Sequence, residues 1–408
     1  MTQSDRVFRA LFVALAVGLG WGIRGDFGHW LGAMYPGAAL GLGFAYVTGQ
    51  KSMFTWIPLL GAIGGLGIST GGEMSYGLLH GYAKADTLIN YAYGFFTLIL
   101  QGGAWGCFGC ALIGLALERE RLKASELAAG TVTVLLSGFL FYITVVELIG
   151  FHINPDRSDA SIAYTGGVIG LFIWLIYSNR RYGLQGAFFG YIGFGLGMAT
   201  GRFLANVSYL QPYPVNHWNI MEVMCGFIGG FIFTYGMLGK KFEEPPEGEG
   251  YGLLNIYSIF YVMFLIPLLH RIRRIDPSEK LDQWAISLQA YGYPSPHTLS
   301  EAVLLLINIV CFFALLGVCF WGYLYWKRKT RWSAFPILYF SLMMLLIQNL
   351  NALYFFYPRQ EGSINMHFVF WVMFALMLLF ALLYPDQSER YPMRKWKGLH
   401  GKNGLQAG

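Results

Sequence analysis

The stretch Gly18-Leu19-Gly20-Trp21-Gly22-Ile23-Arg24-Gly25 closes an apolar run with alternating glycines and then places a charge. Two later stretches repeat this arrangement: Gly65-Leu66-Gly67-Ile68-Ser69-Thr70-Gly71-Gly72-Glu73 and Gly195-Leu196-Gly197-Met198-Ala199-Thr200-Gly201-Arg202. Glycine near a helix end in a membrane lets backbones approach closely or exposes peptide groups to a ligand. Three such ends, each beside a charge, predict a polar site built from internal repeats inside a membrane.

The composition of the 408-residue chain is that of a membrane protein. It is 55% hydrophobic and 12% charged, whereas about 25% of the residues in a soluble domain are charged. A helix that crosses a bilayer needs about 20 apolar residues. This pattern predicts an all-α polytopic protein with about twelve transmembrane helices, at residues 7–23, 32–48, 54–70, 89–117, 126–149, 162–178, 184–200, 218–238, 252–270, 299–326, 333–353 and 365–384.

The distribution of Lys and Arg predicts the orientation of these spans. With the N-terminus inside, inner loops and tails hold 19 of the 28 basic residues and the outer loops hold nine. Inner loops of membrane proteins carry such an excess. We therefore expect a multi-pass protein of the cell inner membrane with both termini cytoplasmic. The bias accounts for the net charge of +6, so we expect no nucleic-acid partner.

Glycine divides the chain into two membrane units. Residues 1–240 contain 42 of the 53 glycines and are predicted to form an eight-helix unit of parallel helical-hairpin repeats. A charged, proline-bearing cytoplasmic linker is expected at 241–251, because such segments form turns and loops. Residues 252–386 are expected to form a four-helix unit and 387–408 a basic cytoplasmic tail. The 252–386 unit is the candidate surface for a homo-oligomer.

Ionisable residues at the outer ends of the predicted spans are the candidate site. Such residues are costly in a membrane and default to a functional hypothesis. Arginine binds carboxylate, sulfate or phosphate through its planar fork; alternatively, the charges neutralise one another. The predicted substrate-binding residues are Arg24, Asp26, His29, Glu73, Arg202, His217 and Glu222.

No sequence pattern assigns a catalytic residue, a metal or a cofactor. Cys107 and Cys110 form a C-x-x-C in the middle of an apolar run, where small residues lining a helix contact are expected instead of the polar partners of a thiolate. No histidines have the H-x-x-x-H spacing that puts two metal ligands on one helix face. We therefore expect no metal and no cofactor.

The segment Gly20-Trp21-Gly22-Ile23-Arg24-Gly25, with Gly28-His29 and Gly32-Ala33-Met34 after it, resembles a signature of uncharacterised bacterial polytopic membrane proteins. The resemblance covers the first two predicted spans. It implies a membrane fold and carries no activity.

Three classes of function fit these patterns. The first is an inner-membrane transporter (a permease) for a small polar, anionic or carbohydrate-like solute, bound at a charged ring near the outer ends of spans 1, 3, 7 and 8. The second is a membrane-embedded enzyme, such as a glycan- or lipid-modifying transferase that uses outer-edge carboxylates or histidines. The third is a structural or assembly subunit. The expected partners are a small-molecule solute and the lipid bilayer.

Overall fold

The structure is a computed structural model of the chain, and it describes residues 1–74, 76–118, 120, 122–154, 159–210, 216–243, 249–272, 277–356 and 366–384. All regular secondary structure in these ranges is helical. In chain order the α-helices are α1 (Gln3–Arg24), α2 (Trp30–Val47), α3 (Ile57–Ser69), α4 (Gly77–Tyr82), α5 (Leu88–Ala116), α6 (Ala124–Tyr142), α7 (Ala160–Tyr177), α8 (Arg181–Leu210), α9 (His217–Met237), α10 (Glu249–Phe260), α11 (Ile266–Ile272), α12 (Pro277–Ala290), α13 (Pro296–Trp326), α14 (Phe335–Asn351) and α15 (Met366–Leu383).

Short 3₁₀ and π segments join or extend these helices. The 3₁₀ turns are η1 (Gly25–Phe27), η2 (Lys51–Phe54), η3 (Thr70–Glu73) and η6 (Thr330–Trp332). Two π segments, η4 (Ile143–Leu148) and η5 (Tyr261–Leu265), follow α6 and α10 without a break. Therefore η5 makes α10 and α11 parts of one continuous rod.

Eight helical stretches are long and apolar enough to cross a membrane: Gln3–Arg24, Leu88–Ala116, Ala124–Leu148, Ala160–Tyr177, His217–Met237, Gly252–Arg271, Pro296–Trp326 and Met366–Leu383. The apolar helices α3 and α14 are shorter. Most side chains of α6, α13 and α15 lie outside the protein core, and their exposed residues are largely Leu, Phe and Ile, as lipid contact requires. The chain is therefore an all-helical, multi-pass membrane protein. A twelve-span topology extends this to α2, α3, α8 and α14 and stays a prediction.

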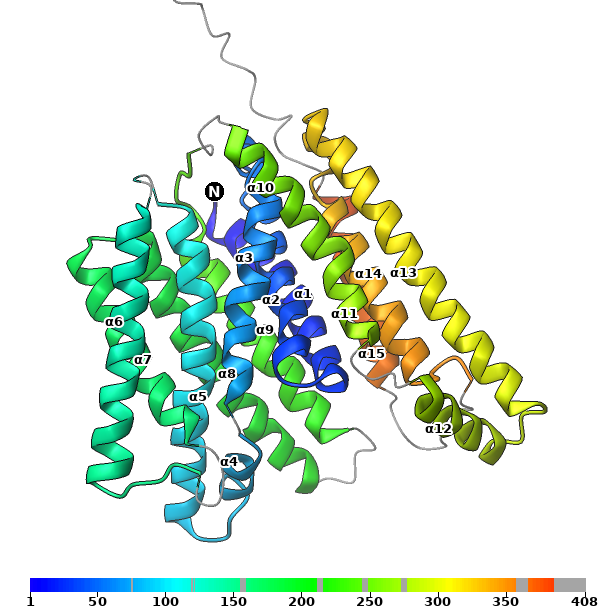
Figure 1. Cartoon of the computed structure of the whole chain (residues 1–408), viewed down its shortest axis with the longest axis horizontal. Helices are drawn as coiled ribbons and strands as arrows, with labels where there is room; N and C mark the ends of the chain where they lie inside the picture. The colour runs from blue at the N-terminus through cyan, green and yellow to red at the C-terminus, as the bar shows by residue number, and fades with distance from the viewer. Residues whose placement is uncertain are drawn as a thin grey trace, which may run out of the picture.

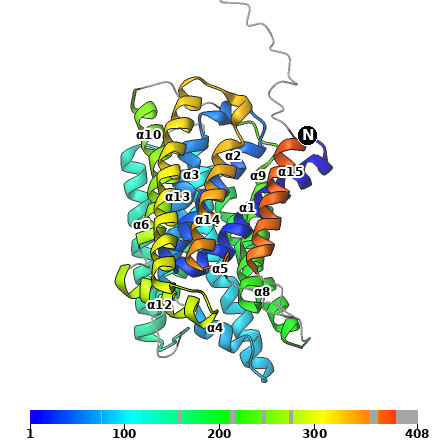
Figure 2. The same cartoon turned by 90° about the vertical axis from the view of Figure 1, so that its right-hand side faces the viewer.

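The helices form one bundle with α1 near its centre (Figures 1 and 2). α1 packs on α2 and α9 of the glycine-rich unit and also on α14 and α15. The α6–α7 hairpin lies at one edge of the bundle and α13 at the other, while the short helices α4 and α12 lie at the same end (Figure 1). The predicted units 1–240 and 252–386 therefore share a continuous interface along α1, α2 and α3.

Small residues bring the helix axes of the first unit close together. A Cβ atom added at Gly102 of α5 would lie 2.6 Å from the Phe194 carbonyl oxygen of α8, and one added at Gly197 would lie 2.6 Å from the Cys225 carbonyl oxygen of α9. A Cβ at Gly20 would lie 2.8 Å from Cα of Pro36. Such backbone approaches are typical of helix pairs in lipid. The glycines of the repeated motif therefore hold helix contacts as well as mark helix ends.

The chain start, the end of α15 and the start of α10 lie at the end of the bundle opposite α4 (Figure 2). The Phe8 and Tyr384 rings stack with their centroids 6.2 Å apart. Gln50, just before η2, accepts a hydrogen bond from the Phe242 amide (2.9 Å) and donates one to the Lys240 carbonyl (2.7 Å). Of the predicted linker and tail, residues 244–248 and 387–408 lie outside the described residues.

Candidate functional site

Arg24 is the last residue of α1 and is 1% exposed. Its backbone continues into η1, and Gly28 then reverses the chain with φ of +84°, a conformation that favours glycine. Two further glycines leave room for the charged groups. A Cβ at Gly25 would lie 2.6 Å from Oε2 of Glu222, and one at Gly32 would lie 2.9 Å from Cγ of Arg24. The glycine-rich helix end therefore creates the space that this ion pair occupies.

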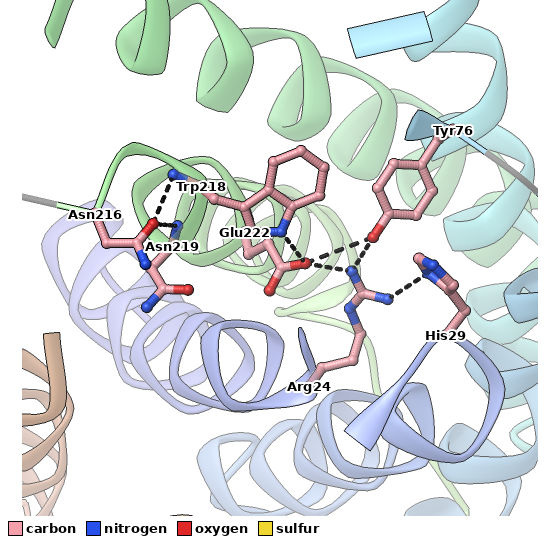
Figure 3. Close-up of polar contacts among 7 residues, drawn as sticks. All are labelled: Arg24, His29, Tyr76, Asn216, Trp218, Asn219 and Glu222. Atoms are coloured by element: carbon pink, nitrogen blue, oxygen red, sulfur yellow. Dashed lines mark hydrogen bonds and ion pairs between the residues drawn. The ribbon is translucent and has the colours of Figure 1, made fainter. Parts of the chain in front are cut away.

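Arg24 forms a buried ion pair with Glu222 of α9. Its Nη2 lies 2.7 Å from Oε1 of Glu222, and both side chains are 1% exposed. The same Nη2 donates to the hydroxyl of Tyr76, which lies just before α4. Trp218 donates its indole N–H to Glu222 Oε1 at 3.1 Å, and Nδ1 of His29 lies 3.3 Å from Arg24 Nη1 (Figure 3). Residues from four parts of the chain therefore converge on one carboxylate and one guanidinium.

Aromatic rings surround the Arg24 guanidinium. Its Cζ lies 5.2 Å from the ring centroid of Trp105, 5.5 Å from that of Trp21 and 5.6 Å from that of Tyr76. Ring faces attract a cation, more strongly where water is excluded. Trp105 is fixed because its indole N–H donates to the Ile68 carbonyl at the end of α3. The cluster is therefore pre-organised by α1, α3 and α5 together.

Arg202 and His80 form the second half of the cluster. Arg202 is 1% exposed and donates to the Asn206 side chain, whose amide donates to the Ala83 carbonyl at 2.7 Å. His80 is 2% exposed and contacts the rings of Tyr76 and Trp218, each with centroids 5.2 Å apart. Burial, with the positive charges of Arg202, Lys84 and Arg24, lowers the pKa of His80 to about 3. His80 is therefore neutral at physiological pH.

The structure brings only part of the predicted site together. Arg24, His29 and Glu222 are in direct contact. Arg202 is buried on α8 and bonds to Asn206, and its positive charge contributes to the lowered pKa of His80. His217, the first residue of α9, instead pairs with the hydroxyl of Ser208 near the end of α8. The backbones of Asp26 and Glu73 lie in η1 and η3, but their side chains lie outside the described part of the chain.

Several residues of the cluster were not among the predicted site residues. Tyr76 and Trp218 belong to the aromatic residues that gather at the outer edge of membrane proteins, which hides their role. The spacing could have identified one of them, because Trp218 and Glu222 are four residues apart and share a helix face. Trp21 and Trp105 lie within apolar runs, where the sequence does not distinguish a site residue from a core residue. His80 precedes the predicted span at 89–117, and no spacing pattern in the sequence distinguishes it from an ordinary loop residue.

The cluster is charged, largely buried and close to the surface of the bundle. Nε of Arg24 is buried and has no hydrogen-bond partner among the described residues, so one N–H of its guanidinium is not committed to a protein acceptor. Nearby Gly25 and His29 are exposed and Trp218 is 38% exposed, so the buried pair lies one side chain below the surface. Within the described residues, no three His, Cys, Asp or Glu side chains gather as metal ligands.

An apolar cavity of about 650 Å³ lies between α5 and the α6–α7 hairpin. It is lined by the glycines of α6 and α7 and by aliphatic and aromatic side chains, from Leu127 and Trp174 to Tyr142 and Tyr164. At one end, the Tyr164 hydroxyl donates to the Thr70 carbonyl of η3 at 2.6 Å. The carbonyl of Ile68, two residues before Thr70, accepts a hydrogen bond from the indole N–H of Trp105. The α3–η3 junction therefore separates this cavity from the charged cluster.

No protein-family model, curated protein or solved structure matches this chain.

Proposed function

We propose that the protein is an inner-membrane transporter for a small polar anion that binds at the Arg24–Glu222 cluster. The observation that carries the proposal is the fully buried Arg24–Glu222 pair at the end of α1, enclosed by aromatic rings and covered by the partly exposed Trp218. The solute is a small molecule with at least one carboxylate, sulfate or phosphate group. The donors proposed for that group are Nε of Arg24, which has no hydrogen-bond partner among the described residues, and the guanidinium of Arg202.

The cost of the ion pair supports a binding role. Removing two charges from water costs several kcal/mol per ion, and well-packed apolar residues often replace such pairs without loss of stability. Packing alone would therefore not require Arg24 and Glu222. Ionisable residues inside a membrane protein instead mark substrate or ion pathways.

The proposed topology has twelve spans with both termini in the cytoplasm. Supporting it, the start of α1 and the end of α15 lie side by side, as an even number of crossings requires. α3 is short, but η2 and η3 extend its path at either end. The charged cluster would then lie near the periplasmic side, and the linker would lie in the cytoplasm.

Substitution of the arginines tests the proposal. Lys keeps the positive charge but loses the planar fork. For the anion that wild-type protein binds best among carboxylates, sulfate and phosphate, Arg24→Lys and Arg202→Lys should each weaken binding about tenfold or more, roughly 1.4 kcal/mol. Affinity is measured by calorimetry on purified protein, and transport by uptake into proteoliposomes.

Arg180→Lys is the matched control. Arg180 is 6% exposed and pairs with Glu126 at 2.8 Å, at the end of the bundle opposite the cluster. Its substitution should leave anion affinity unchanged. Wild-type affinity in both cluster variants would exclude the anion site.

The apolar cavity favours one alternative, a membrane enzyme that acts on a lipid-linked substrate. The chain of such a substrate would occupy the space between α5, α6 and α7, with its head group near η3. Filling the cavity with Gly167→Phe should then abolish turnover of a lipid-linked substrate. The same change should leave binding of a small soluble anion unaffected if the protein is a transporter. A homo-oligomer through the 252–386 unit stays a prediction.

A further inference from the structure

Two almost fully buried polar side chains, His80 in the cluster and Gln101 one helical turn before Trp105, have no hydrogen-bond partners among the described residues. His80 of α4 and Gln101 of α5 are each 2% exposed. Both ring nitrogens of His80 and both amide atoms of Gln101 are unpartnered. Buried polar groups are nearly always hydrogen-bonded, and each exception needs an explanation.

The His80 ring lies within the cluster itself. It contacts Tyr76, which bonds to Arg24, and Trp218, which bonds to Glu222. Its charge state is set by burial and by Arg202. One neutral donor and one neutral acceptor therefore lie next to the ion pair.

The register of α5 places Gln101 on the same side. Trp105, four residues later, packs on the Arg24 guanidinium and lies 6.0 Å from Tyr76 between ring centroids. Gly94, seven residues earlier, packs against the backbone of Ala83 at the end of α4. Residues spaced by four and seven share a helix face, so Gln101 lies on the stretch of α5 that faces α4.

We infer that His80 and Gln101 bind hydroxyl groups of the solute and that the ligand is a polyhydroxylated carboxylate, that is, a sugar acid. The inference rests on the proposed anion site and names its ligand class. A hydroxyl both donates and accepts, as do the neutral imidazole and the amide. Trp218 stacks on Tyr76, with ring centroids 6.2 Å apart and an interplanar angle of 16°, and is itself 38% exposed, so its exposed part would pack against the C–H groups of such a chain.

Matched ligands separate the charge from the hydroxyl groups. The probes are gluconate, glucuronate and glycerate as sugar acids, hexanoate as a carboxylate without hydroxyls, sorbitol as an uncharged polyol, and inorganic phosphate. Binding to the purified full-length protein is measured by calorimetry. At least one sugar acid should bind about tenfold or more tightly than hexanoate, sorbitol and phosphate, because a site built for hydroxyls rejects analogues that lack them.

Two substitutions test the named residues. Gln101→Met and His80→Phe keep the approximate side-chain volume and remove the polar atoms. Each should weaken the best sugar acid about tenfold and leave hexanoate binding unchanged. Each should also raise the melting temperature of the ligand-free protein, because an apolar group replaces an unsatisfied buried polar one. Thr234→Val is the control: Thr234 is also buried with an unpartnered hydroxyl but lies on the part of α9 remote from Glu222, and this change should not alter sugar-acid affinity.

The outcomes distinguish this inference from the proposed function. If hexanoate or phosphate binds as tightly as every sugar acid and Arg24→Lys weakens that binding, the anion site stands and the hydroxyl site is excluded. Unchanged sugar-acid affinity in both Gln101→Met and His80→Phe also overturns the inference. If no anion binds, the proposed function itself fails.

Discussion

At the scale of single residues, the Arg24–Glu222 pair is a coupled unit. The two charges lie 2.7 Å apart and neither is exposed, so each compensates the desolvation of the other. Tyr76 and Trp218 add hydrogen bonds to the same two groups. The consequences of changing one partner therefore differ from those of changing both.

Removing one partner of the pair should be strongly destabilising. Glu222→Leu leaves Arg24 buried without its carboxylate and should cost about 3–5 kcal/mol of unfolding free energy. Arg24→Met with Glu222→Leu should recover most of that loss. The measurement is thermal and denaturant unfolding in detergent. Glu301→Leu on α13 is the control, because Glu301 is exposed and surface substitutions usually change stability by about 0.5 kcal/mol or less. A double variant as unstable as Glu222→Leu would show that the pair is not coupled.

His80 should make the protein less stable in acid. Its folded pKa of about 3 lies below the ordinary value of 6.5, so the unfolded chain binds a proton that the folded chain excludes. Stability is therefore complete above about pH 6.5 and is lost as pH falls from there toward 3, by up to about 1.4 kcal/mol per pH unit. His80→Asn cannot titrate and should show a smaller fall in melting temperature between pH 7 and pH 4.5. Parallel melting curves for both proteins over this range would contradict the assignment.

At the scale of helices, glycine sets the separation of the axes. Gly20, Gly67 and Gly197 each face the backbone of a neighbouring helix, and all three belong to the repeated motif. A side chain added at any of these positions would clash with main-chain atoms of the neighbouring helix. Main-chain atoms cannot rotate away as a side chain can. By contrast, the three atoms nearest to a Cβ at Gly317 of α13 all belong to the Tyr339 ring.

Leucine at the motif glycines should disrupt the bundle and the site together. Gly20→Leu, Gly67→Leu and Gly197→Leu should each cost about 1–3 kcal/mol or more, because overpacking displaces the helices, and each should lower anion affinity. The measurements are melting temperature and calorimetric binding. Gly322→Leu on α13 is the control, since no atom lies within 4 Å of a Cβ there. Equal behaviour of Gly322→Leu and Gly197→Leu would exclude the packing role.

At the scale of the whole molecule, two units of different composition form one bundle. The glycine-rich unit contributes the charged cluster, and the α10–α15 part packs against α1, α2 and α3. His270 of α11 contacts the Phe27 ring of η1 with centroids 4.6 Å apart. The second unit therefore supports the turn that follows Arg24.

Cysteine labelling should establish the topology. With the exposed Cys319 changed to Ala, the other four cysteines are buried and the background should be unreactive. Lys123→Cys and Glu243→Cys should react with an impermeant reagent only from the cytoplasmic side, and Val207→Cys only from outside. Each expected side follows from the bias of Lys and Arg toward inner loops. Opposite labelling at any of these positions would exclude the twelve-span model.

The sequence by itself determined the class of the fold, because hydropathy and helix formation are local properties of the chain. Apolar runs, sparse charge and frequent small residues are visible directly in the sequence, and they indicate membrane-spanning helices. Arg24 is a candidate site residue because a charge at the end of a glycine-rich apolar run is costly. The partner of Arg24 was a different matter. Glu222 is 198 residues away, and only helix packing decides that it meets Arg24 while His217, five residues earlier, meets Ser208 instead. Tyr76 became part of the cluster for the same reason: a short-range pattern fixes which face of a helix a residue occupies, and only the tertiary structure decides what that face meets.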